Sequence, residues 1–172
     1  ASQLIDYSER RLTAEIAELP EGTYDAAMTV EDDGVGTDPF EVKVKLVIRG
    51  GQVIADFTGS SPQVRGPMNC TFVVVAAALY NAIFCVADPQ DLIPRNSGCY
   101  RPDRVIAPPG SVVNVKHPGP SVGGNTDLQP KLIDLLLAAF AQAVPERIAA
   151  SSGGSSSNLL FGGTHPETGR YY

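Results

Sequence analysis

The sequence predicts an α+β fold in which an antiparallel β-meander packs against two buried apolar helices, with long glycine-rich loops between them. Apolar and polar residues alternate from 40 to 49, and a tight Gly50-Gly51 turn follows, which is typical of a hairpin. Two apolar stretches of helical length lie at 72–87 and 132–144. A parallel α/β sheet is the alternative, because strand–helix–strand units recur after Phe57. We expect residues 1–172 to form a single domain.

The first predicted element is an amphipathic helix over residues 4–19. Ile5, Leu12, Ile16 and Leu19 are spaced to share one face, and Pro20 ends the helix. A strand is expected at 23–30, followed by an acidic loop at 31–38. The hairpin strands at 40–49 and 52–57 come next. We therefore expect at least three antiparallel strands with one face covered.

The second half of the chain alternates apolar helices with irregular segments. The helix at about 71–87 is apolar on all sides, so we expect it inside the domain or beneath a partner. Short strands are expected near 105–106 and 112–115, separated by a turn at 108–110. A second helix is expected at about 126–144 and a further short strand at 159–161.

The composition argues against several classes of protein. The net charge of −6 and the absence of a basic stripe disfavour binding to nucleic acid or to an anionic membrane. The longest apolar run is shorter than the roughly 20 residues of a membrane-spanning helix. Cys70, Cys85 and Cys99 lack CxxC spacing, which indicates reduced thiols and a cytoplasmic protein. Charged residues make up only 19%, which suggests that a neighbour covers part of the surface.

Several loops could bind a ligand. Gly123-Gly124-Asn125 precedes a helix, where backbone N–H groups favour anions; a tight loop with an Asn or Thr cap is the simpler interpretation. The stretch SSGGSSS at 151–157 could be a linker, an ordered structural loop or a ligand loop. Arg65 and Arg101 lie in polar loops, where each could hold a carboxylate or bridge the loops through backbone carbonyls.

The sequence has no recognisable metal or hydrolase motif. Asp32, Asp33 and Asp38 lack the spacing of a calcium loop, so we expect a solvated hairpin loop there. His117 and His165 are the only histidines, and neither HExxH nor GxSxG occurs. We therefore assign no metal ligand in this chain.

Taken together, these segments resemble the hydantoinase B/oxoprolinase family. Residues 56–69, DFTGSSPQVRGPMN, are similar to the family motif DFSGTSPQVxGPxN. NSGCYRP at 96–102 resembles NxGCxRP, and VIAPPGS at 105–111 resembles xVIAPxGS. The segments 4–11, 31–36 and 123–127 also fit the family. Each motif alone is modest, but together they follow the family order nearly from end to end.

The resemblance implies ATP-dependent chemistry on a lactam, imide or ketone. A companion A-type subunit would bind ATP and phosphorylate the substrate oxygen, and the activated species would be hydrolysed or carboxylated on the B side. ATP and a divalent metal would belong to the full complex, with none bound by this chain alone. The implied partners are the A-type subunit and the remainder of the same B-type subunit, in a hetero-oligomer. B-type subunits of the family are several times longer, and their Asp/His metal-ligand segment lies upstream.

We therefore expect an excised internal or C-terminal-half domain of a B-type subunit that opens hydantoin or 5-oxoproline-like rings. Donors already in place would stabilise the negative charge that develops during ring opening. The expected catalytic residues are Asn125 and Asp127, and the expected substrate-binding residues are Arg65, Asn96, Arg101, Gly123, Gly124 and Ser155. One alternative is a structural or interface domain of such a subunit, or of a related ketone carboxylase, without chemistry of its own. A stand-alone ligand-binding module is another.

Overall fold

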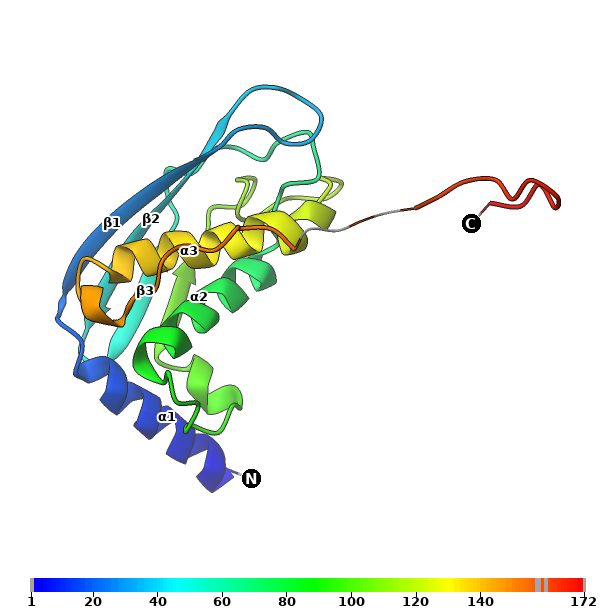
Figure 1. Cartoon of the computed structure of the whole chain (residues 1–172). Helices are drawn as coiled ribbons and strands as arrows, with labels where there is room; N and C mark the ends of the chain where they lie inside the picture. The colour runs from blue at the N-terminus through cyan, green and yellow to red at the C-terminus, as the bar shows by residue number, and fades with distance from the viewer. Residues whose placement is uncertain (1, 157–158, 160, 172) are drawn as a thin grey trace.

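Within the described part of the chain, three α-helices and one four-stranded sheet make up the fold (Figure 1). The computed structural model describes residues 2–156, 159 and 161–171. The α-helices are α1 (Ser2–Ala17), α2 (Phe72–Ala87) and α3 (Gln129–Phe140). The strands are β1 (Gly22–Val30), β2 (Phe40–Arg49), β3 (Gln52–Asp56) and β4 (Asp103–Ile106). Short helical turns lie at η1 (Ser97–Tyr100), η2 (Gly124–Leu128) and η3 (Pro145–Arg147).

The sheet has the order β1-β2-β3-β4 and is mostly antiparallel. β1 and β3 each pair antiparallel with β2, and the Gly50-Gly51 turn joins β2 to β3 as expected. β4 pairs parallel with β3, with Val53 opposite Asp103, because the chain crosses through α2 before it returns to the sheet. The predicted α+β class and meander are confirmed, and one parallel pair is added at the edge.

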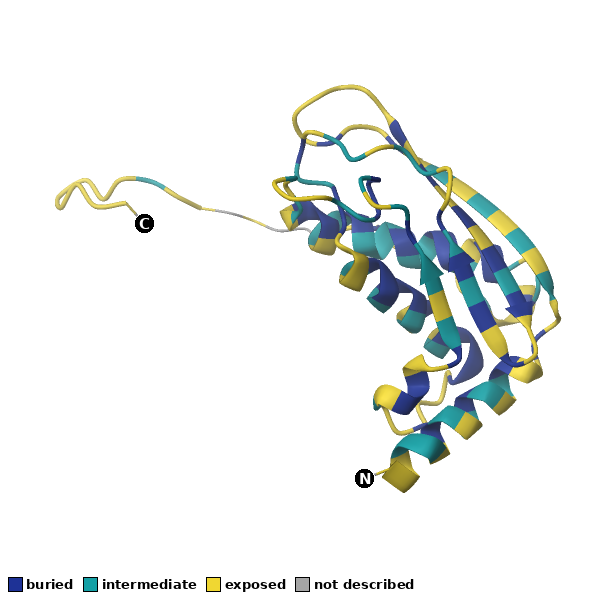
Figure 2. Ribbon diagram, turned by 180° about the vertical axis from the view of Figure 1, so that it is seen from behind, coloured by how far each residue is buried: buried dark blue, intermediate teal, exposed yellow. Residues whose placement is uncertain are grey.

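Helices cover one face of this sheet, as the alternation in β2 predicts. Phe40, Val42, Val44, Leu46 and Ile48 are buried, while the residues between them are mostly exposed. Figure 1 shows α2 and α3 lying across the covered face, and Figure 2 shows the resulting alternation of buried and exposed positions along the strands. The core therefore lies between the sheet and the helices.

Helix α2 is buried on one side only. Val75, Leu79 and Ile83 are fully or almost fully buried, whereas Phe72 is 45% and Val73 74% exposed. The helix packs on the core along this side only, although its sequence is apolar on all sides. Its first turn is open to solvent, and the expectation that a partner covers part of the helix stays a prediction.

Three expected elements differ from the structure. The segment at 112–115 is not a strand, because Val112 and Val113 are both buried and form a turn between the bridged residues Ser111 and Asn114. Its backbone bonds to the 61–70 loop: Val112 N–H donates to the Ser61 carbonyl at 3.0 Å, and Val115 N–H donates to that of Cys70 at 3.0 Å. The second long helix is a π-turn followed by α3, and it ends at Phe140. At 159–161, Leu159 and Phe161 are not in a strand, and residue 160 lies outside the described residues.

The three cysteines are free, as expected: Cys70 and Cys99 are buried and Cys85 is exposed. No helix in the described ranges is both long and apolar enough to cross a membrane.

Candidate functional site

A groove of about 860 Å³ lies where three loops meet at the end of β1 and the start of α3. Its walls come from residues 29–34, from Pro67-Met68 and from the turn that precedes α3. The side chains that give it polar character are Thr29, Glu31, Asp32, Asp33, Thr126, Asp127 and Lys131. The groove thus unites parts of three segments, 31–36, 56–69 and 123–127, that are far apart in the sequence.

Two glycines let the backbone segments cross beneath this groove. A β-carbon on Gly124 would lie 2.0 Å from the carbonyl oxygen of Asn69, and one on Gly66 would lie 1.9 Å from that of Asp33. Atoms cannot approach so closely, so any side chain at either position would force the segments apart. These two glycines therefore have a packing role in the motifs.

The buried amide of Asn69 joins the backbone segments that lie next to the groove. Its Oδ1 accepts from Val64 N–H at 2.8 Å, and its Nδ2 group donates to the carbonyls of Gly66 at 3.0 Å and Pro120 at 2.8 Å. A third contact of Nδ2 reaches the Val64 carbonyl at 2.9 Å. Asn69 is fully buried, so these bonds satisfy groups that cannot reach water.

Asp33 anchors the acidic loop to the backbone of Gly66. Its carboxylate accepts from the N–H groups of Gly36 at 2.6 Å, Gly66 at 2.7 Å and Val35 at 2.9 Å. These backbone hydrogen bonds, led by that of Gly36, lower the pKa of Asp33 to about 2. The expected solvated loop is therefore wrong for Asp33, which is buried, although Asp32 and Asp38 are exposed.

Asp127 ties the start of α3 to the serine-rich segment. Its carboxylate accepts from the hydroxyls of Thr126 at 2.6 Å and Ser155 at 2.7 Å, and these two bonds lower its pKa. Lys131, one turn further along, donates to the Gly154 carbonyl at 2.9 Å. Asp127 is therefore an ionised acceptor at neutral pH, with a cationic side chain on the same face of the helix.

The described part of the serine-rich stretch, 151–156, follows α3 as an ordered loop. Ser156 N–H donates to the Thr126 carbonyl at 2.8 Å, and the hydroxyl of Ser152 donates to Asp134 at 3.0 Å. The geometry favours the structural loop among the three interpretations of this stretch, and Ser155 reaches the groove through Asp127.

Asn125 lies in the turn η2, between Gly123 and Thr126 of the groove wall. Its side chain is exposed, and among the described residues it makes no hydrogen bond. Gly123 lines the groove, whereas Gly124 lies beneath it against Asn69. Arg65 is exposed and lines a separate hollow of about 370 Å³ on the other side of the 61–65 loop.

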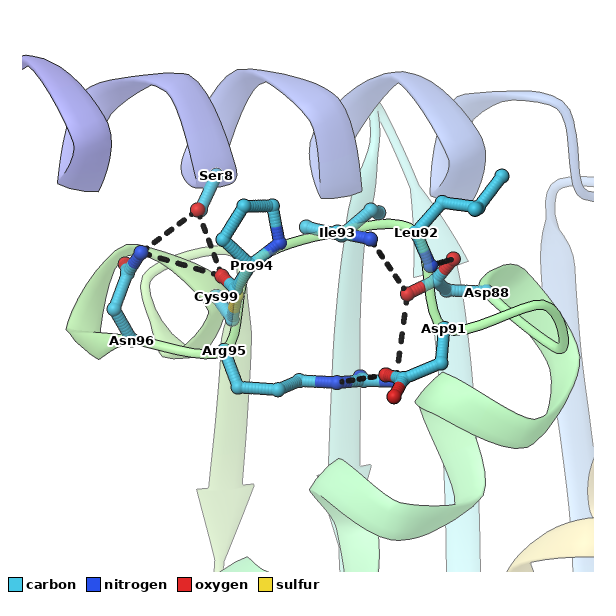
Figure 3. Close-up of polar contacts among 9 residues, drawn as sticks. All are labelled: Ser8, Asp88, Asp91, Leu92, Ile93, Pro94, Arg95, Asn96 and Cys99. Carbon is cyan, nitrogen blue, oxygen red and sulfur yellow. Dashed lines mark hydrogen bonds and ion pairs between the residues drawn. The ribbon is translucent and has the colours of Figure 1, made fainter.

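Asn96 and Arg101 belong to the segment 96–101, which lies beside α1 at the end of α2 opposite to the groove. Figure 1 shows this segment next to α1. Asn96 accepts from Gly98 N–H at 2.9 Å and donates to the hydroxyl of Ser8 at 2.8 Å (Figure 3). Arg101 forms ion pairs with Asp6 and Glu9 of α1. The structure thus brings Gly123, Gly124, Asn125, Asp127 and Ser155 together, and it does not bring Asn96, Arg101 or Arg65 to them.

A further buried carboxylate shapes that second region. Asp88, at the end of α2, accepts from the N–H groups of Leu92 at 2.9 Å and Ile93 at 3.1 Å, and it pairs with Arg95 at 3.4 Å (Figure 3). Sequence reasoning missed Asp33, Asn69 and Asp88 as structural residues. The Asp-x-x-Gly spacing at Asp33 and the helix-ending Asp-Pro pair at Asp88 are the signals that could have found two of them.

A metal ion does not fit the part of the chain that the structure describes. No three His, Cys, Asp or Glu side chains converge there with the arrangement that a metal needs.

The fold and the groove define an α+β domain whose glycine-rich loops cross at one end of a sheet covered by helices. The chain belongs to the hydantoinase B/oxoprolinase family, whose family model matches residues 1–172. That match confirms the resemblance seen in the motifs.

Relatives and a solved structure support the same assignment. The chain is 33% identical to a 5-oxoprolinase of Pestalotiopsis fici, over 96% of this chain and 12% of that protein. It is 30% identical to the B-type subunit of a putative D-/L-hydantoinase of Pseudomonas sp. (strain NS671), over 89% and 27%. The crystal structure of an ATP-dependent caprolactamase from Pseudomonas jessenii matches with a TM-score of 0.84 and 27% identity, over 99% of this chain and 29% of that chain. The chain thus spans less than a third of each of these proteins.

Proposed function

We propose that this chain is a domain of the B-type subunit of an ATP-dependent amidohydrolase that opens hydantoin or 5-oxoproline-like rings. The observation that supports this most strongly is the groove, because it is assembled from three separate segments that resemble the family. The proposed complex also includes ATP, a divalent metal and an A-type ATP-binding subunit. The names of the related proteins, a 5-oxoprolinase, a hydantoinase subunit and a caprolactamase, support the substrate class.

The proposed chemistry assigns different tasks to Asn125 and Asp127. The amide of Asn125 is exposed beside the groove and can donate a hydrogen bond to the oxygen on which negative charge develops. Asp127 has a lowered pKa and is a weak base at neutral pH. We assign it the role of an ionised acceptor that orients a substrate N–H or the attacking water.

The charge of the groove favours a neutral ring. Among the described residues, four carboxylates, Glu31, Asp32, Asp33 and Asp127, line it together with one ammonium group, that of Lys131. A cleft with an excess of negative charge lowers the local concentration of anions and admits neutral molecules without that penalty. A neutral hydantoin therefore suits this groove better than 5-oxoproline, which bears a carboxylate.

The test is a ring-opening assay on the complete B-type subunit, purified together with its A-type partner. With a neutral hydantoin and ATP, the assay should detect the ring-opened product, and omission of ATP should abolish it. Replacement of the hydantoin by 5-oxoproline should give slower turnover. Ring opening at an equal rate without ATP, or of neither substrate with ATP, would contradict the proposal.

A structural or interface domain is the second candidate. Asn96 and Arg101 are both engaged in contacts that hold the 96–101 loop against α1, which supports this role for that half of the molecule. Alanine at Arg101 would then weaken assembly of the complex and leave the rate per assembled complex intact. If the groove is catalytic, alanine at Asn125 would lower the rate per assembled complex and leave assembly intact.

A further inference from the structure

The last described residues form an arm that leaves the body of the protein. We define the arm as residues 161–171. Figure 1 shows it extending away beyond α3, and Figure 2 shows that nearly all of it is exposed. Among the described residues, no hydrogen bond or ion pair joins the arm to the body. The described part of the body therefore makes no polar contact with the arm.

The arm nevertheless has an ordered turn of its own. Thr164 and Tyr171 form an antiparallel bridge, and His165 N–H donates to the Arg170 carbonyl at 2.8 Å. The imidazole Nδ1 of His165 accepts from Thr168 N–H at 3.3 Å. Gly169 closes the turn with a positive φ of 65°. A turn formed in advance loses less conformational entropy on binding than a flexible tail would.

The arm also exposes large apolar side chains. Phe161 is 83% and Tyr171 88% exposed, which exceeds the 76% of Val122 and the 74% of Val73 on the body. Aromatic side chains contribute most when they are buried at an interface, and an ordered segment that keeps two of them in water is typical of a docking element.

We propose that the arm docks onto the remainder of the longer subunit polypeptide, with Phe161 and Tyr171 buried in an apolar recess of that remainder. This inference rests on the proposed function, which makes the chain one domain of such a subunit. The caprolactamase match covers 99% of this chain but only 29% of that chain, so a relative of this fold carries a much longer polypeptide beyond the matched part, of the kind that could receive the arm. A second copy of the same chain is the competing occupant.

The test measures hydrogen–deuterium exchange in the complete subunit. The wild-type protein is compared with a Phe161→Ser/Tyr171→Ser double variant and with a Leu92→Ser control, because Leu92 is a 65% exposed apolar residue on the body. Amides of residues 161–171 should exchange at least about tenfold more slowly in the wild type than in the double variant, since docking protects them. The control should match the wild type. Both variants should keep the wild-type circular dichroism spectrum, because none of the changed side chains belongs to the core of this domain.

Two results would overturn this inference. Exchange of the arm at the same rate in the wild type and the double variant would show that Phe161 and Tyr171 do not dock. Protection that grows with protein concentration and follows dimer formation would assign the arm to a second copy. Neither result depends on turnover, so failure of the arm to dock is distinguishable from failure of the ring-opening assay.

Discussion

The carbonyl oxygen of Asn69 occupies the place that a β-carbon on Gly124 would need, because such an atom would lie only 2.0 Å away. The thiol of Cys70 reinforces this crossing by donating to the Gly124 carbonyl at 3.2 Å. Burial raises the pKa of that thiol to about 12, so it remains a protonated donor. The loop before α2 and the turn before α3 are thereby held together under the groove.

Gly124→Ala should destabilise the domain because the new methyl group forces the two backbones apart. Overpacking of this kind costs about 1–3 kcal/mol or more. Gly153→Ala is the matched control, since no atom lies within 4 Å of its β-carbon position. Urea denaturation should show a lower midpoint for the first variant and little change for the second. Equal midpoints would contradict the tight crossing.

Asp33→Asn should weaken the protein at neutral pH. The folded-state pKa of about 2 lies below the unfolded value, so the ionised carboxylate stabilises the fold above about pH 4. That contribution is lost as the pH falls from about 4 to 2. Melting temperatures measured across this range should therefore fall more steeply for the wild type than for Asp33→Asn. Asp38→Asn, at an exposed position in the same loop, should follow the wild type.

Asp103 gives the opposite dependence on pH. Both of its carboxylate oxygens are buried without a hydrogen-bond partner among the described residues, and burial raises its pKa to about 7. A raised folded-state pKa contributes stability below about pH 4 that is lost as the pH rises through 7. Asp103→Asn should therefore gain stability relative to the wild type at pH 8, by about 4 kcal/mol. An unchanged difference between pH 4 and pH 8 would show that the carboxyl has a partner.

Arg101→Ala should leave ring opening by the assembled complex unchanged while it loosens the 96–101 loop. The change removes two exposed ion pairs to Asp6 and Glu9, so the loss of stability should be small. Arg104→Ala is the control, because Arg104 is exposed on β4 and has no described ion pair. A drop in kcat/KM specific to Arg101→Ala would instead restore Arg101 as a substrate-binding residue.

The regular elements could be predicted because each has a local pattern. β2 alternates in sequence since one face of the sheet is covered, and the apolar run of α2 marks a helix packed on the core. A strand is expected from the sequence at 112–115 because consecutive valines are typical of a strand. The expectation is wrong because the backbone there bonds to a distant loop. Its partners around Ser61 and Cys70 lie far away in the sequence.

The groove was only partly predictable for the same reason. The turn 123–127 is recognisable from its glycines and its position before a helix. The roles of Asn69 and Asp33 depend on backbone groups up to 51 residues away, and no local spacing indicates such contacts. The motif at 96–102 suggests a ligand site, but in the structure it lies beside α1 at the other end of α2.

The most direct test of the proposed function is the kcat/KM of Asn125→Ala in the complete complex with its A-type subunit. Asn125 is exposed beside the groove, so the change should not disturb folding, and Asn81→Ala on the exposed side of α2 is the matched control. If the amide stabilises developing charge, the Asn125 variant should lose about 100-fold in ring opening while the control keeps the wild-type rate. An unchanged rate for Asn125→Ala would contradict a catalytic role for the groove and favour the structural domain.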